Sequence, residues 1–397
     1  MESSHPAEKG LRPPGPPVID ACAFHDWVSK DALLPYVGKG WRDLLAIENV
    51  QVKGQWQNQP QDDRAGPETT PPTGGPPASD PAYLIRQLLE ERGSERVVLG
   101  HEQGLLSAGL PMAYKSRAVV RALNDWTIAE WLERDERLYG HLLVQSGLPE
   151  EAAHEIRRVG EHEKFVAVAL GPNGLNQAFG HPAYMPIYDA AVELDLPVVL
   201  QVGADNIADL GTTPTSIGLS ATYAEYDAMS VAPLMTHLTS MFTSGIFDLH
   251  PSLRVLLVGG GVAWVPQFLW RLDPIYRVVR RVDMPWSKRL PSEYFAEHVR
   301  LSTYSLEAPA KKGQLESVLN LIPQIESSLL YASGYPNADG ETAASIAERL
   351  PEALHQSVFH DNAEQFYRWN GTQPKAAPAQ RHGDIVENEA AIRAGGG

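Results

Sequence analysis

Two histidine–carboxylate pairs stand where this sequence could carry out proton transfer. His101 and Glu102 follow the apolar run RVVLG, and His25 and Asp26 come shortly after the apolar run VIDACA. A histidine beside a carboxylate can share a proton with it, so each pair could serve as general acid and general base near neutral pH. For His101 and Glu102, a solvated position in a loop is an equally open alternative.

Cys22, the only cysteine of the chain, precedes the first of these pairs. It could act as a thiolate nucleophile with a nearby base. The alternative is a small buried residue that packs beside Phe24, since residues 22 and 24 share one face of a strand. We favour packing, because His25 has the opposite strand parity and meets Cys22 only if the chain turns there. Asp20 could be a general base or, equally, a buried structural carboxylate.

The composition excludes several other kinds of site and partner. A net charge of −16 over 397 residues opposes binding to nucleic acid or to an anionic membrane. A single cysteine rules out an intramolecular disulfide and two-cysteine zinc sites, and it suits a reducing compartment. The first residues do not read as a signal peptide, and no run approaches the roughly 18 apolar residues of a membrane span. We therefore expect a cytoplasmic protein.

The elements that must position these residues are short apolar runs that alternate with helical patterns. The expected strands are residues 18–23, 96–100, 138–145, 165–170, 196–203, 253–259, 299–304 and 329–333. The clearest expected helices are residues 117–135, 149–162, 184–195 and 341–350. Continuous apolar runs are typical of strands buried on both faces of a parallel sheet. The pattern predicts the α/β class and a (β/α)8 TIM barrel, whose strand ends bring distant side chains to one mouth.

An open doubly wound sheet is the second choice, because no glycine-rich phosphate loop follows the first strand. We expect one barrel domain over residues 17–370, preceded by a disordered segment, residues 1–16. A polar, Pro- and Gly-rich stretch, residues 51–80, is expected to form a long loop or arm after the first strand. Residues 371–397 are expected to form a C-terminal tail.

Several stretches, in this order, resemble one known family. They are ALNDWTIAEWLERDERLYG, EEAAHEIRRVGEHEKFVAVAL, YMPIYDAAVELDLPVVLQVG, GIFDLHPSLRVLLVGGGVAWVPQFLWRLD, PSEYFAEHVRLSTYSLEAP, LLYASGYPNADG and DNAEQFYRW. The chain resembles the amidohydrolase-related family, the branch of the amidohydrolase superfamily that includes aminocarboxymuconate semialdehyde decarboxylase. The resemblance implies a TIM barrel with a divalent metal at its strand ends. The family's ligands are Asp-x-His or His-x-His on the first strand, His on the fifth, a ligand near the sixth and Asp on the eighth.

This chain departs from the family's ligand pattern at each strand that can be aligned. The positions concerned hold Cys22, Phe24, Gln201, Gly259, Gly334 and Asn337. Phenylalanine and glycine cannot bind a metal through a side chain, and glutamine is a poor ligand for zinc. We therefore predict that the family's metal centre is lost and that the protein has no metal and no other cofactor.

The side chains left at the strand ends could bind a small molecule instead. The candidates for substrate binding are Cys22, Phe24, Gln201, Tyr304, Tyr335 and Asn337. The two amides could hold a carboxylate or a carbonyl group, and the two phenols could donate protons. The sequence does not name the substrate.

Two main classes of function remain open. The first is a metal-independent enzyme of lyase, cyclase, dehydratase or isomerase type, acting on a small polar or aromatic molecule. Its proton-transfer groups would be His25, Asp26, His101 and Glu102. The second is a catalytically inactive relative that acts as a ligand-binding protein or as a partner subunit, and a hydrolase with a relocated metal site is a third possibility. Polar residues at several strand ends favour the enzyme, and we expect it to form a homodimer.

Overall fold

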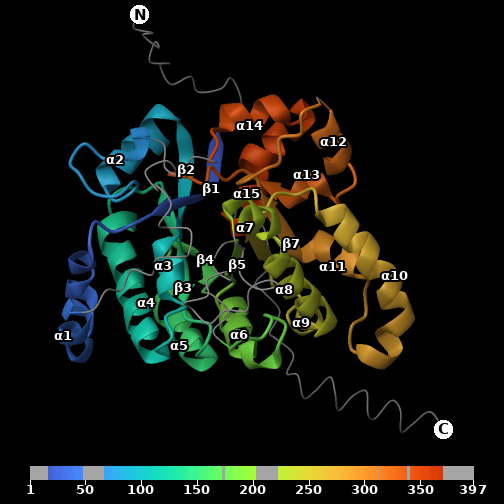
Figure 1. The fold of residues 1–397 in the computed structure, drawn as a ribbon, viewed down its shortest axis with the longest axis horizontal. Coiled ribbons are helices and arrows are strands. Elements are labelled where there is room, and N and C mark those ends of the chain that lie inside the picture. The colour runs from blue at the N-terminus through green and yellow to red at the C-terminus, as the bar shows by residue number, and fades with distance from the viewer. Residues whose placement is uncertain are drawn as a thin grey trace, which may run out of the picture.

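Eight parallel strands form a single sheet in which each strand pairs with the next one along the chain (Figure 1). The computed structural model describes residues 17–47, 67–171, 175–202, 222–311, 313–337 and 340–369. The strands are β1 (Val18–His25), β2 (Ser94–His101), β3 (Leu138–Val144), β4 (Phe165–Leu170), β5 (Val198–Gln201), β6 (Val255–Val258), β7 (Val299–Ser302) and β8 (Leu329–Leu330). All eight expected strands are present, so the predicted (β/α)8 barrel is confirmed.

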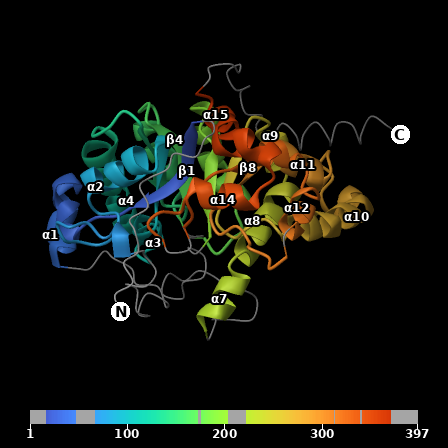
Figure 2. The same cartoon turned by 90° about the horizontal axis from the view of Figure 1, so that it is seen from above.

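Helices surround the sheet (Figure 2). They are α1 (Lys39–Ile47), α2 (Pro81–Ile85), α3 (Gln103–Ser107), α4 (Ala113–Thr127), α5 (Pro149–Val159), α6 (Met185–Glu193), α7 (Tyr223–Met229), α8 (Ala232–Thr243), α9 (Ile246–Leu249), α10 (Val265–Asp283), α11 (Pro291–His298), α12 (Gln314–Leu319), α13 (Ile325–Ser328), α14 (Ala343–Arg349) and α15 (Asn362–Tyr367). The four helices expected from the sequence correspond to α4 with the π-helical segment η6 (Ile128–Leu132), α5, α6 and α14.

Backbone hydrogen bonds between the first strand and the end of the last one close the sheet into a barrel. The N–H of Ala21 donates to the carbonyl of Tyr331 at 2.8 Å, and the N–H of Gly334 donates to the carbonyl of Cys22 at 3.1 Å. Closure of this kind leaves no unpaired strand edge. It also places the residues after β8 beside the carboxyl end of β1.

Two apolar clusters divide the core into the barrel interior and the layer between barrel and helices. The interior cluster includes Ile19, Val98, Val166, Val199, Leu256, Leu330, Phe366 and Tyr367. The last two belong to α15, and the Tyr367 hydroxyl donates to the carbonyl of Ala21 at 3.1 Å. Helix α15 therefore covers the amino-terminal end of the barrel. The carboxyl-terminal end, where TIM barrels carry their active sites, forms the mouth.

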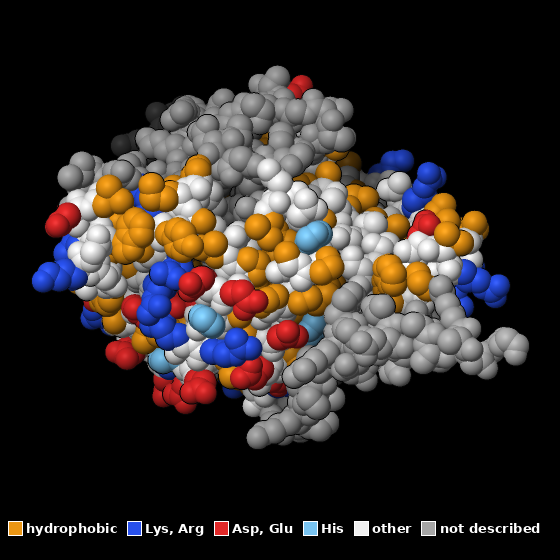
Figure 3. All heavy atoms as spheres, turned by 90° about the horizontal axis from the view of Figure 1, so that it is seen from below, with side chains coloured by type: hydrophobic (Ala, Val, Ile, Leu, Met, Phe, Trp, Pro, Cys, Tyr) orange, Lys and Arg blue, Asp and Glu red, His pale blue; other side chains and the backbone are white. Residues whose placement is uncertain are grey.

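Three expected segments lie wholly or partly outside the described residues. They are the N-terminal segment 1–16, most of the arm 51–80 and the tail 371–397. Among the described helices, none combines the length and the apolar character that crossing a bilayer requires. Acidic and basic side chains are interspersed on the face shown in Figure 3, so the net charge of −16 is not gathered there into one acidic patch.

A buried carboxylate holds the seam between β1 and β8 in register. Asp20 Oδ1 accepts the N–H of Cys22 at 3.2 Å and the N–H of Ser333 at 2.9 Å. The pairing of β1 with β2 shifts register between Asp20 and Ala23, which marks a bulge. Because of the bulge, Ala21 and Cys22 both belong to the interior cluster although they are neighbours in the chain. Of the two roles open to Asp20, this geometry favours the structural one.

We expect Asp20→Ala to destabilise the protein by about 3 kcal/mol, because two buried backbone N–H groups lose their acceptor. Asp20→Asn keeps one oxygen at that position and should cost about 1 kcal/mol. Urea unfolding followed by circular dichroism measures both free energies. Equal losses for the two variants would show that the acceptor geometry at Asp20 is not what stabilises the seam.

Candidate active site

Cys22 and Phe24 point into the barrel from the carboxyl half of β1. Both side chains are buried within the interior cluster. Gly100 of β2 lies against them, because a Cβ placed there would be 2.8 Å from Cys22 Sγ and 3.3 Å from the Phe24 ring. Burial, followed by the charges of Asp20 and Glu102, raises the pKa of the Cys22 thiol well above its ordinary value. Cys22 is therefore a protonated thiol that packs beside Phe24.

The ring of Tyr304 fills the space above Gly334, where the family resembled in sequence carries an aspartate. A Cβ at Gly334 would lie 2.0 Å from an atom of this ring. The ring also meets Phe24 edge-on, with centroids 5.6 Å apart. Asn337 Nδ2 donates to the Tyr304 hydroxyl at 3.0 Å. Phe24, Tyr304 and Asn337 are thus brought together at one side of the mouth.

Asp26 and Glu102 form a pair of carboxylates at the same end of the barrel. They directly follow His25 and His101, which are register partners on β1 and β2. Both side chains are half-buried. Burial raises the pKa of Asp26 to about 7, and the nearby charge of Glu102 adds to this, although Oδ1 accepts the N–H of Trp27 at 2.7 Å. A carboxyl group with this pKa is protonated in a large fraction of molecules at neutral pH, as a general acid must be.

His25 lies in an aromatic cluster between the barrel and α4. Its ring stacks on Trp126 with centroids 5.5 Å apart and meets Trp131 edge-on. Nδ1 donates to the carbonyl of Gly100 at 2.8 Å, so Nε2 is left to accept from the Thr127 hydroxyl at 2.9 Å. Burial lowers the pKa of His25 well below its ordinary value. The imidazole is therefore neutral, with both nitrogens bonded within the wall.

His101 is buried beside His25, with ring centroids 4.8 Å apart. Its Nε2 donates to the carbonyl of His141 at 3.0 Å. Burial lowers the pKa of His101 to about 4. The structure thus brings the two histidines together in the wall and the two carboxylates together at the mouth, and it separates each histidine from the acid that follows it.

Of the two remaining candidates, Gln201 lies at the mouth and Tyr335 points away from it. Gln201 is half-buried at the end of β5, opposite Val258 of β6. The Tyr335 hydroxyl donates to Gln87 Oε1 at 2.5 Å, and the Arg92 guanidinium lies 5.4 Å from its ring centre. Gln87 belongs to η5 (Arg86–Glu91), which packs outside the barrel. Tyr335 therefore ties the loop after β8 to the helix layer.

A further residue at the mouth, Glu307, was not identified from the sequence. Its carboxylate accepts hydrogen bonds from the N–H of Val262 and from the N–H of Ala263, both at 2.9 Å. The preceding residues, 259–261, are glycines with φ between 64° and 83°, a left-handed backbone that glycine adopts without strain. In the sequence, the three consecutive glycines after a buried strand were the feature that could have pointed to this loop. Glu307 anchors this loop to the loop after β7 that carries Tyr304.

Residues 111–369 match the model of the family described as Amidohydrolase. The chain belongs to the amidohydrolase family. The gamma-resorcylate decarboxylase of Rhizobium radiobacter is 23% identical over 301 residues, which cover 72% of this chain and 86% of that protein. The family expected from the sequence is thereby confirmed.

Two solved structures share the fold of this chain. The 2,6-dihydroxybenzoate decarboxylase from Rhizobium superimposes with a TM-score of 0.61 at 19% identity, covering 89% of this chain and 99% of its own. The 5-carboxyvanillate decarboxylase from Novosphingobium aromaticivorans, in a complex with manganese, gives a TM-score of 0.63 at 18% identity, covering 91% and 98%. Both relatives are decarboxylases, and the second was solved with a metal ion.

The described side chains at the strand ends do not fit a manganese ion of that kind. Among the described residues, no group of three or more histidine, cysteine, aspartate or glutamate side chains is arranged to hold a metal. At the strand ends, Cys22 is buried beside Phe24, which offers no donor atom, and the Tyr304 ring covers Gly334. A divalent cation needs several charged or strongly polar donors converging on one point.

The raised pKa of Asp26 makes the stability of the protein depend on pH. In the unfolded chain an aspartate titrates near pH 4, so the folded state binds the proton more tightly. The stabilisation that comes from this tighter proton binding is fully present below about pH 4 and is lost as the pH rises through about 7. Asp26→Asn removes the charged form, so its stability relative to the unmodified protein should increase between pH 5 and pH 8. Urea unfolding across this range measures the difference, and parallel pH profiles would contradict the assignment.

We expect Gly334→Asp to destabilise the protein by about 2 kcal/mol, because its side chain overlaps the Tyr304 ring. Aspartate tolerates the positive φ of this position, so the overlap is the main cost. The variant should not bind manganese, and neither should Gly334→Asp combined with Tyr304→Ala, which relieves the overlap. Thermal unfolding and manganese titration test this. Stoichiometric binding by either variant would show that a single aspartate completes a metal site.

Proposed function

We propose that this amidohydrolase-family protein is a metal-independent lyase that removes carbon dioxide from a small aromatic acid at the barrel mouth. The observation that carries the proposal is the Asp26–Glu102 pair, in which one carboxyl group has a pKa of about 7. The names of the relatives, decarboxylases of dihydroxybenzoate and carboxyvanillate, supply the substrate class. The strand-end residues within the described part of the chain, where no cluster of metal-ligating side chains lies, support a reaction without a metal.

In this reaction Asp26 is the proton donor. The bond between the ring carbon and the carboxylate breaks, its electron pair stays on the ring carbon, and carbon dioxide leaves. The proton of Asp26 then forms the new C–H bond, and water returns a proton to Asp26. Glu102 acts on this step through its charge, which helps to keep Asp26 protonated at neutral pH. The amides of Gln201 and Asn337 are the groups placed to orient the oxygens of the substrate.

A second candidate function is binding without catalysis, either of a ligand or of a partner subunit. The packing of Tyr304 over Gly334 and against Phe24 favours it, because these rings occupy space that an open active site would leave for substrate. The homodimer and the cytoplasmic location expected from the sequence stay predictions, and so do the catalytic roles first assigned to His25 and His101.

Incubation of the purified protein with 2,6-dihydroxybenzoate and with 5-carboxyvanillate tests the proposal, with substrate loss measured by chromatography. We expect turnover that EDTA does not reduce and added manganese does not increase. Asp26→Asn should lower kcat by about 10²- to 10⁴-fold, the usual contribution of one positioned acid. Because Asp26 must be protonated, the rate should fall as the pH rises above about 7. Glu102→Gln should move this fall to lower pH.

Asp31→Asn, an exposed change close to the site in sequence, is the matched control and should leave kcat unchanged. Turnover that appears only with manganese would overturn the metal-independent reaction. Saturable binding of either acid without turnover would favour the second candidate function. The absence of both binding and turnover would remove these aromatic acids as the substrate class.

A further inference from the structure

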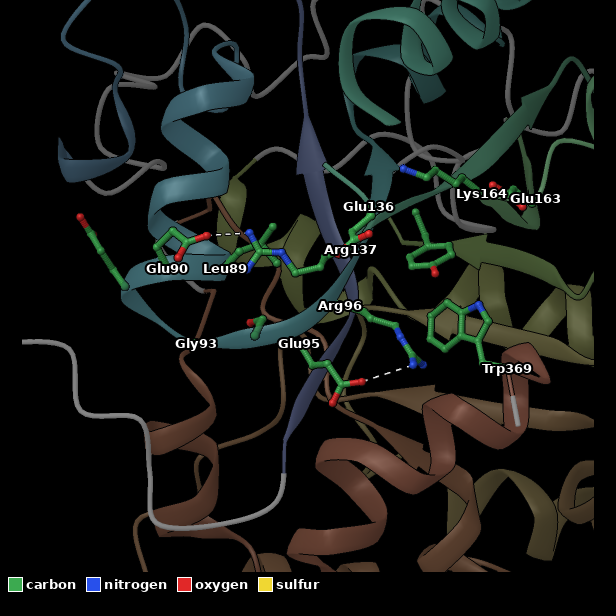
Figure 4. Close-up of a pocket in the computed structure, with 13 residues that line it drawn as sticks. Leu89, Glu90, Gly93, Glu95, Arg96, Glu136, Arg137, Glu163, Lys164 and Trp369 are labelled. Carbon is green, nitrogen blue, oxygen red and sulfur yellow. Dashed lines mark hydrogen bonds and ion pairs between the residues drawn. The ribbon is translucent and has the colours of Figure 1, made fainter. Parts of the chain in front are cut away.

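A hollow of about 820 Å³ lies at the amino-terminal end of the barrel, opposite the mouth (Figure 4). Its wall is formed where β2, β3 and β4 begin and where α15 has just ended. This volume lies within the range of about 300–1,000 Å³ that is usual for small-molecule sites. It shares no residue with the candidate active site, so a ligand bound here would be separate from the proposed reaction.

The charged lining of the hollow is predominantly acidic. It comprises the carboxylates of Glu90, Glu91, Glu95, Glu136 and Glu163 and the cations of Arg96, Arg137 and Lys164. The cations are already bonded within the protein. Lys164 Nζ donates to the carbonyls of Leu132 and Asp135 at 2.5 and 2.9 Å. Figure 4 shows the other two pairing with carboxylates, Arg137 with Glu90 at 2.6 Å and Arg96 with Glu95 at 3.3 Å.

The polar groups left over can all accept hydrogen bonds, and two of them are carboxylates. Within the part of the chain that the structure describes, the carboxylates of Glu136 and Glu163 have neither an ion pair nor a hydrogen bond. The Ser94 side chain, 7% exposed and part of the lining, likewise has no hydrogen-bond partner among the described residues. Its oxygen is not among the fully buried polar atoms without a partner, so it is reached from the hollow and can accept a hydrogen bond from a ligand there. With the cations engaged, these groups select a cationic ligand.

An aromatic wall borders the same hollow. The rings of Tyr139 and Trp369 lie with centroids 4.8 Å apart, and both are half-buried. The Arg96 guanidinium is 4.9 Å from the Trp369 ring centre, so the wall already lies beside a cation. Methylene groups between two ammonium ends would pack along these rings while the ends reach the carboxylates.

We propose that this hollow binds a small aliphatic polyamine, with its ammonium groups at Glu136 and Glu163, the Ser94 hydroxyl accepting from one of them, and its methylene chain along Tyr139 and Trp369. The site is distinct from the mouth, and the proposal does not depend on the proposed lyase reaction. The ligand class follows from the unpaired carboxylates, the unpartnered hydroxyl and the apolar wall taken together.

Calorimetric titration of the full-length protein with spermidine at low ionic strength tests the proposal. We expect one site per chain that weakens with added salt, because the carboxylates are exposed. The double variant Glu136→Gln/Glu163→Gln should bind spermidine at least about tenfold more weakly than the unmodified protein. Ser94→Ala should bind about threefold more weakly through the loss of one hydrogen bond. Thermal unfolding checks that each variant folds.

The double variant Glu348→Gln/Glu352→Gln is the matched control, since it makes the same change of net charge at exposed positions outside the hollow. It should bind spermidine like the unmodified protein. An equal loss in the control would mean attraction to the overall negative charge, and no binding by the unmodified protein would also overturn the proposal.

Discussion

The register of β1 depends on a single buried carboxylate, and much of the mouth depends on that register. The carboxylate of Asp20 accepts hydrogen bonds from the N–H of Cys22 and from the N–H of Ser333, across the seam where the barrel closes. Side chains on a strand alternate between its two faces, so a bulge of one residue exchanges the faces of everything that follows. After the bulge, Cys22 and Phe24 face the interior and His25 faces the helices. Without it, the histidine would stand where the phenylalanine now packs.

The change of strand face at the bulge explains why the mouth contains both apolar packing and a carboxyl group with a raised pKa. Phe24 and Tyr304 make one side of it apolar, and an apolar wall lowers the local dielectric and disfavours charged groups. Asp26 lies just beyond this wall and beside Glu102, so burial and a neighbouring charge of the same sign act in one direction on its pKa. Because of the bulge in β1, His25 lies on the side of the helices, and His101 packs beside it there. In the proposed reaction, proton transfer at this end therefore falls to a carboxyl group.

The sequence predicted the fold well and the site only in part, and the reasons are physical. Apolar runs specify strands buried on both faces, so all eight strands were found from local pattern alone. The shared face of Cys22 and Phe24 followed from strand parity. The role of Tyr335 did not, because its hydrogen bond to Gln87 joins residues far apart in the chain. The packing of Tyr304 over Gly334 did not follow from strand parity either, because it depends on how two loops meet.

The two ends of the barrel carry different kinds of polar surface, and this follows from how the ends are built. At the mouth, the strand ends converge, so the side chains that follow β1 and β2 are brought together and the pKa of Asp26 is raised. At the other end, Phe366 and Tyr367 of α15 fill the interior, and polar residues are left on an outer rim around Trp369. Exposed carboxylates on such a rim interact with ligands by charge. Neutral proton donors are therefore expected at the mouth, and charged anchoring groups at the rim.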